Sequence, residues 1–176
     1  MGIALTISGY DTLPGMSDFL QQQGTGVTFE QMLDEAGEGV RGVIKRNLPP
    51  NRPKQEVYDS MLAQREQLRK AVRDYFERQG IAAIVSPPIL VPPPKIGEEV
   101  EVEIRGQKIP LYIAMSRNIS LGSCASMVSL VLPAGTTSSG LPVGLEFDAL
   151  SGNDRQLLSL GLSLEKVLGP MPSPRI

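Results

Sequence analysis

The sequence predicts an α/β fold, and three observations support this. The segment 54–79 repeats apolar residues at helical spacing and is followed by a glycine. The apolar run 81–86, "IAAIVS", comes next and lacks alternation, which is typical of a strand buried on both faces of a sheet. The C-terminal region then carries two apolar strands, at 128–134 and 141–150, and a leucine-rich helix within 152–169 that Asn153 or Asp154 caps and Gly169 ends.

The N-terminal third predicts a short strand followed by helices. The run 2–8, "GIALTIS", is apolar and β-leaning, and turn-rich residues follow it. A helix is expected at about 16–23. Thr28 with Gln31 three residues later forms the capping-box pattern at the start of another helix. The segment 39–47 predicts a further short helix, which the prolines after it end.

The middle of the chain predicts a rigid loop and a hairpin. Residues 87–94, "PPILVPPP", hold five prolines in eight positions and favour an extended loop. A proline-recognising domain could bind such a segment, but a loop that leaves a buried strand is expected to pack on its own protein. Apolar and charged residues alternate up to Gly106, which predicts a half-exposed hairpin. Its glutamates are expected on a solvated surface rather than in a metal site: Glu98, Glu99, Glu101 and Glu103.

Composition limits the partners and the compartment. The 176 residues are 41% hydrophobic and 20% charged, with a formal net charge of −2, which gives no reason to expect nucleic acid or an anionic membrane as partner. No signal-peptide pattern is present, and no apolar run approaches the roughly 20 residues of a membrane-spanning helix. A single cysteine, Cys124, permits no internal disulfide. The predicted location is cytoplasmic.

Histidine is absent, which limits the chemistry within the chain. Catalysis by a serine or cysteine with a histidine base is excluded, as is a histidine-ligated zinc site. The pair Ser138 and Ser139 in "GTTSSGLPVG" could be nucleophiles or a polar turn. The nearest lysine in sequence, Lys166, is expected on the exposed side of the final helix, so the turn is favoured. We predict no catalytic residue, metal or cofactor here.

The segment around these serines resembles the amidase signature family. Pro133-Ala134-Gly135 ends one predicted strand, and 140–145, "GLPVGL", begins the next, as in that family. The stretches 80–107 and 116–127 also look like the corresponding segments of these amidases. The latter, "SRNISLGSCASM", is most similar to the branch of mandelamide and indoleacetamide hydrolases.

The resemblance implies the fold and an incomplete active site. It implies an α/β structure that is the C-terminal part of the amidase-signature fold, a mixed sheet flanked by helices, with 1–176 as a single portion and 170–176 as a loose tail. Members of the family use a Ser–Ser–Lys triad on an N-terminal Gly/Ser-rich signature, and nothing in this sequence matches that signature. The chain alone is therefore expected to be inactive.

The resemblance also implies a substrate and a pocket. The reaction would be hydrolysis of a small, aryl-substituted primary amide, with no metal or cofactor. Asn118, Ser123 and Cys124 are the candidate substrate-binding residues, although a tight turn that satisfies backbone groups is an equal alternative. A non-catalytic interaction or subunit module, or the matching portion of a tRNA-dependent amidotransferase subunit, is the alternative function. Strands built for burial but left uncovered predict self-association, as a homodimer.

Overall fold

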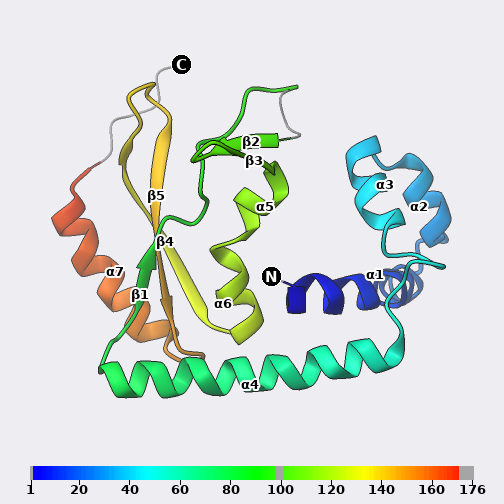
Figure 1. Ribbon diagram of the computed structural model, residues 1–176, viewed down its shortest axis with the longest axis horizontal. Coiled ribbons are helices and arrows are strands. Elements are labelled where there is room, and N and C mark those ends of the chain that lie inside the picture. Colours follow the sequence, from blue (N-terminus) through cyan, green and yellow to red (C-terminus); the bar gives the residue numbers. More distant parts are fainter. Residues whose placement is uncertain (1, 98–100, 171–176) are drawn as a thin grey trace. The chain divides into compact units, whose positions relative to one another are not determined.

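A computed structural model describes residues 2–97 and 101–170 of the chain (Figure 1). It divides into two compact units, Gly2–Gln67 and the part from Leu68 onward. The predicted α/β class is confirmed, with helices and small antiparallel sheets. The elements are α1 Gly2–Gln22, α2 Phe29–Glu35, α3 Glu38–Lys45, α4 Gln55–Gln79, β1 Ile84–Ser86, β2 Glu101–Ile104, β3 Gln107–Pro110, α5 Leu111–Ser116, α6 Ile119–Ala125, β4 Val128–Thr136, β5 Pro142–Ala149 and α7 Asp154–Leu168.

The strand predicted at 2–8 is wrong, because these residues begin helix α1. Ile3, Thr6 and Ile7 favour a strand locally, but contacts distant in sequence favour the helix. Gly9 is buried in α1, and a Cβ there would lie 2.5 Å from Oδ1 of Asn47. Only a helix surface without a side chain at this position allows that close approach.

A proline inside α1 is compensated by an arginine. Pro14 lacks the N–H that would bond to the carbonyl of Tyr10 in a regular helix. The Nε of Arg52 donates to this Tyr10 carbonyl oxygen at 3.0 Å. The guanidinium carbon of Arg52 also lies 4.0 Å from the centroid of the Tyr10 ring. The ring of Tyr58 stacks on the Tyr10 ring, with 4.1 Å between the two centroids. These contacts hold α1 to the loop before α4.

The predicted capping box at the start of α2 is confirmed. The backbone N–H of Gln31 donates to Oγ1 of Thr28 at 3.2 Å, and the backbone N–H of Thr28 donates to Oε1 of Gln31 at 2.9 Å. The helix buries Phe29 and Leu33. The short helix predicted after it is α3, so this part of the first unit follows its local sequence signals.

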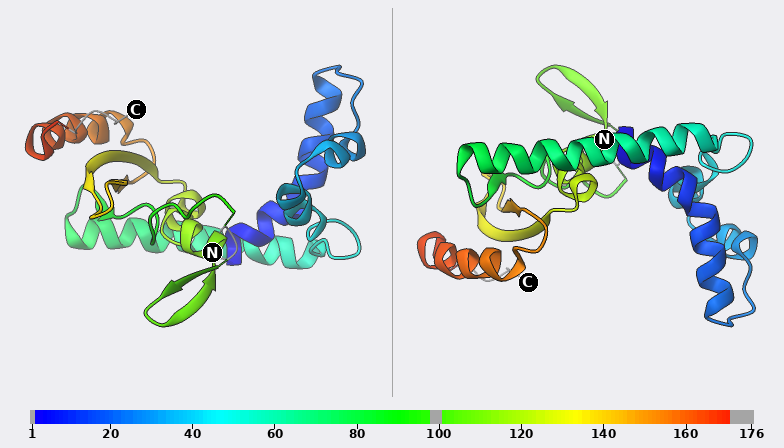
Figure 2. Two further views of the ribbon diagram at one scale, coloured as in Figure 1. Left: turned by 90° about the horizontal axis from the view of Figure 1, so that it is seen from above. Right: turned by 90° about the horizontal axis from the view of Figure 1, so that it is seen from below.

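The second unit is built on a three-stranded antiparallel sheet in the order β1-β5-β4. Helix α7 lies on one face of it and α6 on the other (Figures 1 and 2). The core under α7 joins residues of β4, β5 and α7: Leu132, Phe147, Ala149 and Leu157. A second core cluster joins the C-terminal half of α4 to α6: Val72, Phe76 and Ala125. The strands predicted at 128–134 and 141–150 and the final helix are confirmed.

The expectation that 81–86 is a strand buried on both faces is wrong. Strand β1 covers only residues 84–86, and Val85 is 53% exposed, because β1 is an edge strand that pairs with β5 alone. Strand β4 likewise alternates buried and exposed residues, with Leu132 buried and Val131 51% exposed. The central strand β5 is buried on both faces over residues 146–149, whereas the edge strands β1 and β4 leave Val85 and Val131 exposed.

The predicted hairpin is confirmed as β2 and β3. Arg105 and Gly106 connect the strands with positive φ angles of 52° and 78°, as a type I′ turn requires. Glu101 and Glu103 are exposed on β2, whereas the predictions for 98–99 and for the tail over 171–176 lie outside the described residues.

Candidate functional site

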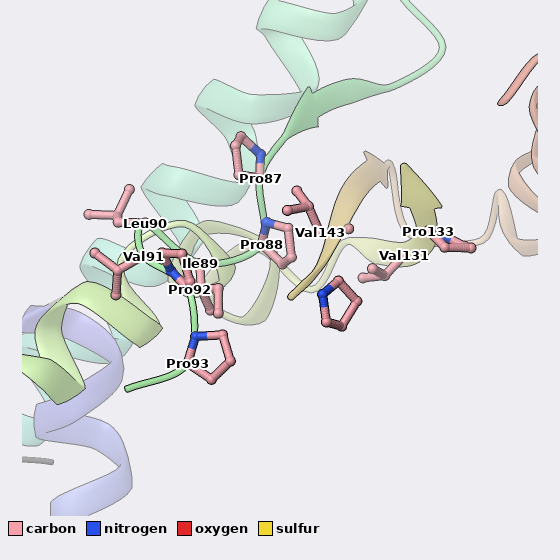
Figure 3. A pocket seen from close by; sticks show the side chains of 12 residues that line it. Pro87, Pro88, Ile89, Leu90, Val91, Pro92, Pro93, Val131, Pro133 and Val143 are labelled. Atoms are coloured by element: carbon pink, nitrogen blue, oxygen red, sulfur yellow. The ribbon is translucent and has the colours of Figure 1, made fainter. Parts of the chain in front are cut away.

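An apolar cavity of about 530 Å³ lies between the proline-rich loop and the three-stranded sheet (Figure 3). Its walls come from loop residues 87–93 and from β4 and β5 at Val131, Pro133, Pro142, Val143 and Gly144. None of these wall residues carries a charged or polar side chain. The space therefore suits the carbon skeleton of a ligand rather than a charged group.

Strand register explains the sheet side of this cavity. Val131 and Pro133 of β4 stand on the sheet face opposite α7, since the alternate residue Leu132 is buried in the α7 core. Gly144 of β5 pairs with Pro133 and shares that face. A Cβ on Gly144 would lie 2.8 Å from Cγ1 of Val131 and 3.7 Å from Cγ of Pro88. The glycine lets the loop and the valine approach the strand.

Hydrogen bonds from α5 and α6 position the loop side. The side-chain amide of Asn118 donates to the carbonyl oxygen of Pro87 at 2.6 Å. The backbone N–H of Leu90 donates to the carbonyl oxygen of Ala114 at 3.2 Å. Because proline has no backbone N–H, the loop has few hydrogen-bond donors of its own. These two hydrogen bonds therefore hold it in place. Asn118, a predicted site residue, therefore contacts a wall residue without lining the cavity.

The other two predicted site residues lie on α6. Ser123 is exposed, and Cys124 is a free thiol that is only 5% exposed. Neither belongs to the cavity wall. The structure thus brings Asn118 to the cavity wall, whereas Ser123 and Cys124 do not line the cavity.

Ser138 and Ser139 form the predicted turn between β4 and β5. The backbone N–H of Gly140 donates to the carbonyl oxygen of Thr137 at 2.9 Å, and the hydroxyls of Thr137 and Ser139 are 2.8 Å apart. Lys166 is exposed on α7, as expected. The turn is held by local hydrogen bonds of the kind that Ser, Thr and Gly supply.

Two buried carboxylates on β5 were missed by the sequence analysis. Glu146 is 5% and Asp148 is 4% exposed, and both stand on the sheet face opposite α7 because Phe147 between them points into the α7 core. The signal was available in "LEFDAL": strict alternation around a core phenylalanine places two acids on one face.

The two carboxylates have different environments. Asp148 accepts a hydrogen bond of 2.5 Å from the hydroxyl of Ser129, and α6 covers it at Gly122. Oε2 of Glu146 has no hydrogen-bond partner within the described residues. Burial raises the pKa of Glu146, and the neighbouring charge of Asp148 raises it further. The cross-strand neighbours of Glu146, Ser86 and Val131, carry no charge that would oppose this.

Comparison with known proteins shows where this architecture recurs. The family model "Amidase" matches residues 27–158. The indoleacetamide hydrolase of Agrobacterium vitis is 28% identical over 169 residues, which are 95% of this chain and 36% of that protein. The mandelamide hydrolase of Pseudomonas putida is 24% identical over 184 residues, covering 98% of this chain and 35% of that protein. The chain thus spans about a third of the length of these curated relatives.

Solved structures with the same fold include an amidase crystal structure and a bacterial aryl acylamidase of the amidase signature family. The first superposes with a TM-score of 0.75 at 24% identity and covers 96% of this chain and 35% of that chain. The second has a TM-score of 0.68 at 16% identity and covers 97% and 34%. Among the helices of residues 2–97 and 101–170, none combines the length and the apolar character of a membrane span.

Proposed function

Because the chain belongs to the amidase family, we propose that it forms the C-terminal part of an amide hydrolase and that its apolar cavity receives the aryl part of a small primary amide. The observation that carries this proposal is the wall itself, which consists of proline, valine, leucine, isoleucine and glycine. The names of the relatives from Agrobacterium vitis and Pseudomonas putida both denote amides that carry an aromatic ring. An aromatic ring gains most from transfer out of water into such a wall.

In this proposal the segment binds substrate and the rest of the enzyme supplies catalysis. The catalytic serines and the lysine base that the family resemblance implies have no match in these 176 residues. The purified chain is expected to release no ammonia from phenylacetamide or indoleacetamide. Ammonia release that scales with the amount of chain, and that survives repeated purification, would contradict the proposal.

Ligand binding tests the cavity without requiring catalysis. We expect phenylacetamide to bind the chain, as seen by ligand-detected NMR, and acetamide, which lacks the ring, to bind far more weakly. Val131→Thr places a hydroxyl in the wall with almost no change of shape, and should weaken phenylacetamide binding several-fold. Val85→Thr is the matched control, since Val85 is similarly exposed on the same sheet but does not line the cavity. Equal effects of the two variants would contradict this cavity as the site.

We propose distinct roles in substrate binding for Asn118, Ser123 and Cys124. Asn118 is a positioning residue, because its amide holds Pro87 in the cavity wall, and Asn118→Ala should weaken ligand binding while leaving the thermal melting of the sheet nearly unchanged. Ser123 and Cys124 lie beside Gly122 on α6 and are proposed to contact substrate in the whole enzyme. Ser123→Ala and Cys124→Ser in this chain test this by their effect on phenylacetamide binding, and a change confined to thermal stability would contradict a binding role.

We also propose self-association and a cytoplasmic location. Leu158 and Leu162 are 59% and 65% exposed, one turn apart on α7, and form an apolar strip on its outer side. Such surface favours contact with a second copy or with another part of the enzyme. Light scattering should show a dimer, and a stable monomer at high concentration would contradict it. The single buried cysteine fits a reducing compartment, which cell fractionation would check.

The matched relatives do not favour the alternative functions. They are hydrolases named for small amides, whereas an interaction module or an amidotransferase portion would be expected to match other kinds of protein. The proline-rich loop, which was the feature most suited to an interaction module, contacts its own protein through Leu90 and Pro87.

A further inference from the structure

A groove of about 870 Å³ lies within the first unit, between helices α1, α2 and α3, which Figure 1 labels. Its apolar wall combines one residue of α1, one of the loop before α2, one of α2 and two of α3: Met16, Val27, Met32, Val40 and Ile44. Val27 and Val40 are exposed, so this wall faces solvent. A solvent-facing apolar groove between helices is the kind of surface into which an amphipathic helix packs.

Both ends of α2 are held in place, so the groove is preformed. At the start of α2, the capping box joins Thr28 to Gln31, and Gln31 itself lines the groove. At the end of α2, the guanidinium of Arg41 on α3 donates to the carbonyl oxygens of Asp34 at 2.7 Å and of Ala36 at 2.8 Å. These bonds tie α3 to the end of α2. A preformed groove loses little conformational freedom when a partner binds.

The charge around the groove is negative. Residues 2–40 contain no lysine or arginine and six acidic residues: Asp11, Asp18, Glu30, Asp34, Glu35 and Glu38. Two of these, Asp34 and Glu35, line the groove and are exposed. Among the described residues that line it none is basic, and the nearby Arg41 directs its guanidinium to backbone carbonyls. The groove therefore favours a partner that presents apolar side chains to the wall and positive charge to Asp34 and Glu35.

We propose that this groove is the docking site for a basic amphipathic helix of a partner protein. Apolar side chains on one face of that helix contact the wall, and lysine or arginine along its edge faces Asp34 and Glu35. Met16 and Met32 suit this role, because methionine is flexible and polarisable and adapts to side chains of different shape. The inference is independent of the aryl cavity, whose wall residues all belong to the second unit.

Labelled peptides test the chemistry of the partner. The probe is a short peptide of leucine and lysine with leucine at helical spacing, and the matched control carries glutamate in place of every lysine. Fluorescence anisotropy with the 176-residue chain should show that the lysine peptide binds about tenfold more tightly than the glutamate peptide, and that its affinity falls as salt is raised. A lysine peptide of the same composition without the apolar stripe should bind weakly. Equal binding of the lysine and glutamate peptides, or no binding of the lysine peptide, would overturn the proposal.

A pair of valine variants locates the site. Val40→Ser removes an apolar contact of the wall and should weaken binding of the lysine peptide several-fold. Val43→Ser is the matched control, because Val43 lies on the same helix and is 58% exposed against 59% for Val40, but does not line the groove. Equal effects of the two variants would overturn the groove as the site. Dissociation of a dimer of the chain by Val40→Ser, seen by light scattering, would also overturn the proposal, since the occupant would then be a second copy.

A pair of charge variants gives a second, independent test. Asp34→Asn combined with Glu35→Gln removes the two acids of the groove and should weaken binding of the lysine peptide several-fold and reduce its salt dependence. Glu30→Gln combined with Glu38→Gln removes the same charge from exposed positions outside the groove and should have a smaller effect. Equal effects of the two combinations, with both variants folded by circular dichroism, would mean that the peptide responds to overall charge alone and would overturn the proposal.

Discussion

The packing of α7 on the sheet leads to a prediction about Gly161. This glycine is buried, and a Cβ built on it would lie 2.4 Å from Cδ2 of Leu130 on β4. Carbon atoms in good contact are about 3.5–4.0 Å apart, so the two groups would overlap by more than 1 Å. The next nearest atom, Cγ of Leu130, would be 3.8 Å away, which is an ordinary contact. One methyl group therefore determines whether alanine fits at this position.

Two opposing contributions determine how much Gly161→Ala changes the free energy of unfolding. Alanine in a helix interior gains about 0.8–1 kcal/mol over glycine, largely because it reduces the freedom of the unfolded chain. Forcing a methylene into a packed core costs about 1–3 kcal/mol. The variant should therefore lose up to about 2 kcal/mol of unfolding free energy and should not gain stability. In a Leu130→Val background, which lacks the clashing Cδ2, the same change should gain about 0.5–1 kcal/mol.

Urea unfolding followed by circular dichroism, on the four chains of this double-mutant cycle, measures the coupling between the two sites. Gly42→Ala is the control, because Gly42 lies inside α3 and a Cβ there meets nothing within 4 Å. That variant should be stabilised by about 0.5–1 kcal/mol. The packing argument is refuted if Gly161→Ala stabilises the chain as much as the control does, or if the two changes at Gly161 and Leu130 are additive.

Three further predictions concern the first unit and the buried acid. Arg52→Ala should cost about 1–2 kcal/mol by thermal melting, because the Tyr10 carbonyl loses its donor; in a Pro14→Ala background, which restores the helical N–H, the same change should cost clearly less. Thr28→Ala should lose about 0.5–2 kcal/mol, and an unchanged melting temperature would contradict a stabilising cap. Because the pKa of Glu146 is raised on folding, the stability that its protonated form provides is complete below the usual value of 4.5 and is lost as pH rises through the raised pKa. Glu146→Gln should therefore match the unaltered chain near pH 4 and exceed it at pH 7.5, and parallel stability curves would contradict this.

Local signals determined which elements could be predicted. The long helix over Gln55–Gln79, the capping box at Thr28 and the turn at Gly106 follow from spacing, side-chain capping and permitted φ angles, and the structure has them all. The helix predicted at about 16–23 is confirmed as the end of α1, but the start of α1 could not be predicted in the same way. Its β-branched start and its internal Pro14 oppose a helix, and the compensating donor, Arg52, comes from a loop 42 residues away from Tyr10. Tertiary contacts here override local preference.

The cavity was beyond sequence reasoning for a related reason. Its walls combine a loop and two strands separated by about forty residues, and the space between them depends on the absence of a side chain at Gly144. The prediction of Asn118, which rested on the family resemblance, identified a residue that holds the loop rather than one that lines the cavity. The strand register is needed to show which cavity the loop and the two strands enclose.

Gly144, Glu146 and Asp148 lie in a row on the face of β5 opposite α7. Asp148 is covered by α6 at Gly122 and bonded to Ser129, and Gly144 is approached by the proline-rich loop. Glu146 lies between the two and receives a donor from neither. A hydrophobic residue at this position would avoid the cost of a buried unpaired carboxylate and would pack equally well beside Val131. An acid there is consistent with a requirement for its hydrogen-bonding capacity.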